Sequence, residues 1–157
     1  MNVAVDFKNV DIVFGNEKPR ALAMIDTGAT RQEILAQTGA VLGCANCNLT
    51  IQEGEISVLS GSGKSTLLRA VNRLDVPARG HVFVKQGDKA VDVVSCDAAT
   101  LRAIRQKQVA MVFQQFALLP WRTVEQNVGF GLELAGVPEA ERNGKPAIWV
   151  SCADVEG

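Results

Sequence analysis

The sequence predicts an α/β fold built around a phosphate-binding loop. Short β-rich runs alternate with helix-forming segments along the 157 residues. A small-residue loop ending in Gly63-Lys64-Ser65 joins a predicted strand to a predicted helix. Val109–Phe113 is a continuous apolar run, which is typical of a strand buried on both faces. We therefore expect helices packed against a sheet.

Composition and charge exclude several classes of function. Hydrophobic residues make up 47% of the chain and charged residues 21%, as in ordinary globular proteins. The formal net charge of −1 gives no support to a nucleic-acid binder, so we expect no such partner. No apolar stretch approaches the roughly 18 residues of a membrane helix, and no signal peptide is visible at the N-terminus. We expect a cytoplasmic chain that can dock on a membrane protein.

The first part of the chain predicts strands interrupted by a helical insertion. Val3–Phe7 and Val10–Phe14 are β-rich runs that predict an N-terminal hairpin. Residues 17–37 are expected to form the insertion, because Thr30 and Glu33 fit a capping box at a helix start.

The remaining elements follow from turn and cap signals. We expect strands at Val41–Ile51, Glu55–Leu59 and Val109–Phe113, and a hairpin of His81–Lys85 with Val91–Val94 around Gly87-Asp88. Helices are expected from Lys64 to about Leu74, after Asp97 to about Lys107, and from the capping box of Thr123 and Gln126 towards Leu134.

The cysteine pattern does not predict a metal or redox site. Cys44 and Cys47 form a lone C-x-x-C without the second pair of ligands that a zinc site needs. Three residues apart on a strand, their side chains are expected to point to opposite faces. We interpret them as small buried thiols.

The loop that carries chemistry reads Ser60-Gly61-Ser62-Gly63-Lys64-Ser65-Thr66. Its small residues allow backbone N–H groups to close around phosphate oxygens. Lys64 is expected to reach the terminal phosphates, and the Ser65 hydroxyl to coordinate Mg²⁺. The pattern departs from G-x-x-x-x-G-K-[ST] at one place, because Val58 occupies the position of the first glycine.

Longer runs around this loop resemble a known family. The loop with the following Leu67–Leu74, and the later segment Val109–Gly136, are similar to the ATP-binding subunits of ABC transporters. The insertion at 17–37 resembles that of the choline and glycine-betaine (quaternary amine) importers. The resemblance covers residues 1–142 as a partial ATP-binding domain and leaves 143–157 as an unmatched tail.

This resemblance implies a fold, a set of ligands and partners. The fold is the P-loop NTPase (ABC ATPase) fold, here truncated, with an N-terminal antiparallel β-subdomain. ATP would stack on Phe14 and bind the loop residues, and Gln114 would be the Q-loop residue that senses Mg²⁺ and the attacking water. The implied partners are a second ATPase subunit, a membrane permease contacted through Gln114–Val124 and, indirectly, a substrate-binding protein. The implied location is the inner face of the cell membrane.

Three motifs of that family are not found in the sequence: the L-S-G-G-Q signature, the apolar strand ending in Asp-Glu (Walker B and the catalytic base), and the switch histidine. We therefore expect no catalytic residue of its own and no hydrolysis. The alternatives are a non-catalytic module that docks on the permease, or a pseudogene-like fragment. A small phosphate-loop kinase is disfavoured by the match of Phe113–Val124. The transported substrate is not readable from these residues.

Overall fold

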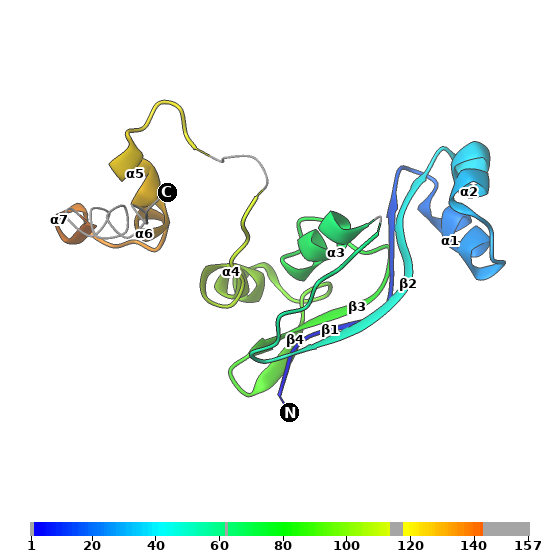
Figure 1. The fold of residues 1–157 in the computed structure, drawn as a ribbon, viewed down its shortest axis with the longest axis horizontal. Coiled ribbons are helices and arrows are strands. Elements are labelled where there is room, and N and C mark those ends of the chain that lie inside the picture. Colours follow the sequence, from blue (N-terminus) through cyan, green and yellow to red (C-terminus); the bar gives the residue numbers. More distant parts are fainter. Residues whose placement is uncertain (1, 62, 114–117, 143–157) are drawn as a thin grey trace. The chain divides into compact units, whose positions relative to one another are not determined.

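The computed structural model describes residues 2–61, 63–113 and 118–142. The chain forms two compact units, residues 1–110 and 111–157 (Figure 1). The tail expected at 143–157 lies outside the described residues.

The first unit is built on a four-stranded antiparallel sheet. Its strands are β1 (Val3–Phe14), β2 (Val41–Gln52), β3 (Arg79–Gln86) and β4 (Lys89–Asp92), in the order β2-β1-β3-β4 (Figure 1). This sheet confirms the expected antiparallel β-subdomain. The turn at Gly87 joins β3 to β4, so the hairpin predicted there is also confirmed.

The predicted N-terminal hairpin is wrong, because β1 is one continuous strand. Asn9 has a φ of 50°, and the pairing register with both neighbours shifts beside it. Asn9 therefore makes a bulge in the strand instead of a turn. Gly80 on β3 permits this bulge, since a Cβ at Gly80 would lie 2.2 Å from the carbonyl oxygen of Asn9.

Two helices cover the core of this sheet. They are α3 (Lys64–Val71) and α4 (Ala98–Lys107), and Asp97 caps α4 as predicted by accepting a hydrogen bond from the Thr100 N–H at 2.8 Å. The main buried cluster joins strand and helix residues: Phe7, Val10, Ile12, Cys44, Ala70, Val82, Val84, Val93, Leu101 and Ile104. Ala70 of α3, with Leu67 and Val71 packed against the cluster, holds this helix on the sheet, and the phosphate loop precedes its first residue.

The predicted insertion forms two short helices, α1 (Lys18–Asp26) and α2 (Arg31–Thr38). The capping box is confirmed: Thr30 Oγ1 accepts from the Glu33 N–H, and Glu33 Oε2 accepts from the Thr30 N–H at 2.7 Å. A second buried cluster of Val13, Ala21, Ile34, Ala40 and Leu42 packs the insertion onto the ends of β1 and β2. The insertion is therefore a fixed part of the unit.

Two predicted strands are wrong. Glu55–Leu59 and Val109–Phe113 have no strand structure, and the described sheet contains neither. The side chains of Ile56 and Val112 are 93% and 97% exposed. An apolar run becomes a strand only where a neighbouring strand completes its hydrogen-bond ladder. Neither run has such a neighbour in the described part of the chain.

The second unit contains α5 (Val124–Val128), α6 (Phe130–Leu134) and α7 (Glu139–Arg142). The capping box of Thr123 and Gln126 is confirmed, but the single helix expected after it is divided at Gly129. Across both units, none of the described helices has the length and apolarity needed to cross a membrane.

Candidate functional site

The phosphate-loop motif leads into α3, as the sequence predicts. Gly63 has a φ of 96° and stands directly before the first residue of the helix. A Cβ at Gly63 would lie 2.7 Å from the Gly43 carbonyl oxygen, so no other residue fits this contact without a shift of the backbone. The loop therefore rests directly on the backbone of β2. Ser62 lies outside the described residues.

Two further expected site residues, Phe14 and Thr66, also meet at Gly43. A Cβ at Gly43 would lie 2.9 Å from Thr66 Cγ2 and 3.0 Å from Phe14 Cε2. The aromatic ring at the end of β1 and the first turn of α3 thus meet over one glycine. Gly43 was not among the site residues expected from the sequence. The available signal was a glycine inside a strand, which often marks a close approach of another group.

Arg31, at the start of α2, is a second residue that sequence reasoning missed. Its Nη2 donates a hydrogen bond to the Gly43 carbonyl oxygen at 3.0 Å. The same nitrogen lies 4.0 Å from where a Cβ at Gly63 would stand. The insertion therefore places a guanidinium group beside the phosphate loop.

The two chemical groups of the loop itself are exposed. Lys64 Nζ donates a hydrogen bond to the Gly61 carbonyl oxygen, so the ammonium group folds back over the loop. The Ser65 side chain is exposed in the first turn of α3. Its hydroxyl suits Mg²⁺, which takes oxygen ligands and draws most of them from phosphates and water. Gln114, the other expected metal ligand, lies outside the described residues.

Val58, which occupies the position of the motif's first glycine, lies on an exposed segment. The Val58 side chain is 88% exposed, and the segment from Gly54 to the loop is not part of the sheet. A valine disfavours the left-handed backbone that a glycine provides at the start of such a loop. The structure thus forms the helix side of the phosphate site more completely than its strand side.

The cysteine prediction is wrong in one respect. Cys44 is buried in the main cluster, and Cys47 packs against the same cluster instead of facing the other way. Asn46 has a φ of 45°, and the register shifts between the pairs Val10–Cys47 and Ile12–Cys44. This bulge adds one residue, which turns both side chains to the same side. Burial raises the pKa of Cys44 to about 11. Among the described residues, no group of three His, Cys, Asp or Glu side chains is placed to hold a metal.

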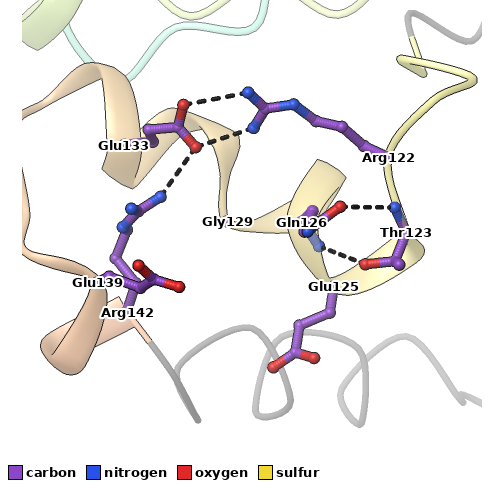
Figure 2. A pocket seen from close by; sticks show the side chains of 8 residues that line it. All are labelled: Arg122, Thr123, Glu125, Gln126, Gly129, Glu133, Glu139 and Arg142. Atoms are coloured by element: carbon purple, nitrogen blue, oxygen red, sulfur yellow. Dashed lines mark hydrogen bonds and ion pairs between the residues drawn. The ribbon is translucent and has the colours of Figure 1, made fainter.

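A separate polar cavity of about 680 Å³ lies in the second unit (Figure 2). Glu133 sits between two arginines and accepts hydrogen bonds from Arg122 at 2.8 and 3.1 Å and from Arg142 at 2.9 Å. These bonds lower the pKa of Glu133 to about 2. Because the charged groups here bind one another, we interpret them as a brace for the segment before α5.

Asn127 completes that brace. Its Oδ1 accepts from the Leu119 N–H at 2.7 Å, and its Nδ2 donates to the carbonyls of Leu119, Arg122 and Thr123. The loop of residues 119–123 is thereby fixed to α5. Leu118, Trp121 and Val124 remain exposed around it.

Comparisons with known proteins agree with this geometry. Residues 44–155 match the ABC transporter family. The chain is 45% identical over 148 residues to the glycine betaine/proline betaine transport system ATP-binding protein ProV of Escherichia coli (strain K12), covering 92% of this chain and 36% of ProV. It is 38% identical over 158 residues to the glycine betaine transport ATP-binding protein OpuAA of Bacillus subtilis (strain 168), covering 99% of this chain and 37% of OpuAA. The chain thus spans about a third of the length of these relatives.

A solved structure shows the same fold. The chain superimposes on the ATP-binding cassette MJ0796, in a dimeric post-hydrolysis state bound to ADP and Pi, with a TM-score of 0.70 and 27% identity. The match covers 97% of this chain and 58% of that chain.

Proposed function

Because this chain belongs to the ABC transporter family, we propose that it is the ATP-binding part of a subunit that energises import of choline or glycine betaine-like quaternary amines, and that the 157-residue chain by itself binds ATP without hydrolysing it. The substrate class follows from the relatives, whose names describe glycine betaine transport. The ATP-binding role follows from those names and from the chain's own phosphate loop.

The observation that carries the proposal is the convergence of Phe14, Thr66 and Gly63 on Gly43. An aromatic ring beside a phosphate loop suits a nucleotide. The flat base can stack on the ring, and the phosphates can bind the N–H groups of the loop. In this arrangement Phe14 stacks on the base. The loop N–H groups and Lys64 bind the phosphates.

Mg²⁺ would be held by Ser65, together with Gln114, and would neutralise charge on the phosphates. Ser65 supplies an exposed hydroxyl oxygen at the start of α3. The chain's other residues at this site bind and orient the nucleotide. The named relatives are ATP-binding proteins, which favours this function over a docking module without a nucleotide.

The proposed partners follow the same reasoning. A membrane permease would be contacted through Gln114–Val124, whose described part exposes Leu118, Trp121 and Val124. Large exposed apolar side chains on a braced loop suit a protein interface. A second ATPase subunit, and a substrate-binding protein reached through the permease, complete the assembly, which would place the chain at the cytoplasmic face of the membrane.

Titration of the 157-residue chain with a fluorescent ATP analogue and Mg²⁺ tests the proposal. We expect Lys64→Ala and Phe14→Ala to weaken binding, the first through lost phosphate contact and the second through lost stacking. Lys89→Ala removes an exposed lysine of β4 and Phe83→Ala removes a ring on β3, so both serve as matched controls. Unchanged affinity in Lys64→Ala and Phe14→Ala would contradict the proposed site.

A further inference from the structure

The start of α2 is held in place from two sides. The capping box of Thr30 and Glu33 fixes the first turn. Ile34, one turn later, is fully buried in the cluster that joins the insertion to the sheet. Arg31 lies between these anchors, so its backbone has little freedom and its guanidinium reaches β2 from a defined origin.

The Gly43 carbonyl is shared by the insertion and the phosphate loop. Arg31 Nη2 donates to this oxygen at 3.0 Å. The same oxygen also contacts Gly63, where an added Cβ would lie only 2.7 Å away. A movement of α2 would therefore change the surface on which the loop rests.

Arg31 also brings positive charge to this point. The hydrogen bond to Gly43 uses one of the five N–H donors of the guanidinium. Of the neighbouring acidic groups, Glu33 is occupied by the capping box, which lowers its pKa. Asp11 is buried and accepts hydrogen bonds from Arg79 and the Asn46 N–H. Lys64 and Arg31 thus supply two positive charges, from two elements, around Gly63.

We propose that Arg31 is a positioning residue for the phosphate loop and provides a second cation for the phosphates of a bound nucleotide. The inference rests on the proposed nucleotide site. It assigns the helical insertion a role in that site: the insertion carries the arginine, so its packing and nucleotide affinity are coupled.

Affinities for ATP, ADP and AMP, measured by fluorescence titration of the full chain with Mg²⁺, test this inference. We expect Arg31→Met to weaken ATP binding about tenfold, because a hydrogen bond to a charged group and one nearby charge are lost. The loss of affinity should be smaller for ADP and smallest for AMP, because these nucleotides carry fewer negatively charged phosphates to interact with Arg31. Arg31→Lys should recover most of the ATP affinity, while Arg31→Gln, which keeps a donor without charge, should not.

Arg20→Gln is the matched control, because Arg20 is an exposed arginine of α1 in the same insertion. It should leave all three affinities unchanged. Urea unfolding of each variant reports whether the insertion still packs. ATP binding that survives Arg31→Met but is lost in Lys64→Ala would overturn the inference alone. An equal loss for ATP, ADP and AMP would also overturn it, because that pattern belongs to a structural residue. If the unaltered chain binds no ATP, the proposed function itself fails.

Discussion

Cys44 shows how one residue's environment fixes its chemistry. Its thiol is buried beside Val10 and Ile12, and this burial raises its pKa from 9.0 to about 11. At pH 8 the folded chain should therefore hold about a hundredfold less Cys44 thiolate than the unfolded chain. We expect iodoacetamide to alkylate Cys44 slowly in buffer and rapidly in urea, as read by peptide mass spectrometry.

The raised pKa of Cys44 also makes the free energy of unfolding depend on pH. A raised pKa favours the fold fully below pH 9, and this contribution is lost as the pH rises from 9 towards 11. Cys44→Ala should remove that part of the alkaline loss of stability. Equal labelling of Cys44 in the folded and unfolded chain would contradict the buried position.

Asp11 and Asp26 bind the same arginine at two different depths. Arg79 Nε donates to Asp11 at 2.6 Å, and its two terminal nitrogens donate to Asp26 at 2.9 and 2.7 Å. Asp11 is 1% exposed and also accepts from the Asn46 N–H, whereas Asp26 is exposed. Asp11→Ala leaves these donors without an acceptor and should cost about 1–3 kcal/mol.

Asp26→Ala removes only an exposed ion pair and should cost at most about 1 kcal/mol. Urea denaturation of the two variants, followed by circular dichroism, measures the difference. The expectation is wrong if the two midpoints coincide, or if Asp26→Ala is the more damaging change.

At the scale of elements, local signals predicted helix starts correctly. Thr30 and Thr123 form their capping boxes, and Asp97 caps α4, because each interaction joins residues three apart in the chain. The turn at Gly87 succeeds for the same reason. Such contacts depend on short-range geometry that the sequence displays directly.

Long-range pairing could not be predicted in the same way. Whether Asn9 makes a turn or a bulge depends on β2 and β3, which pair on either side of it. The apolar runs Glu55–Leu59 and Val109–Phe113 suggested strands, but apolarity does not supply a neighbouring strand. In the candidate site, motif and family resemblance pointed to the loop and Phe14, whereas the contacts of Gly43 and Arg31 arise only in the fold.

The segment before the phosphate loop lacks the first glycine of the motif, and restoring this glycine should strengthen ATP binding. Inserting Met-Gly-Leu between Leu59 and Ser60 would place a glycine five residues before Gly63, as the full motif requires. The insertion gives the loop the length and the backbone freedom of the full motif, so we expect ATP affinity to rise about tenfold. The measurement is calorimetric titration with ATP and Mg²⁺.

A Met-Ala-Leu insertion at the same place is the control, because it has the same length without the glycine. It should give much less improvement. If all three chains bind ATP with equal affinity, then neither the length of this segment nor its missing glycine limits the site.

For the whole molecule, the distribution of apolar surface predicts self-association. Ile56, Val58 and Val112 are 93%, 88% and 97% exposed. They lie on the two segments that the sequence predicted to be buried strands. Burying each side chain is worth on the order of 2 kcal/mol, and an extended apolar segment also offers unpaired backbone groups to another chain. We expect the isolated 157-residue chain to form soluble oligomers or aggregates and to bind a hydrophobic dye.

Replacing those three residues by lysine should shift the chain towards monomer in analytical ultracentrifugation and reduce dye binding. The control places three lysines at Gln32, Gln37 and Gln106, which are exposed polar positions on α2 and α4, so the added charge is equal but the apolar surface remains. This control should associate nearly as much as the unaltered chain. A monomeric unaltered chain, or equal dispersal by both sets of lysines, would show that these three side chains do not drive association.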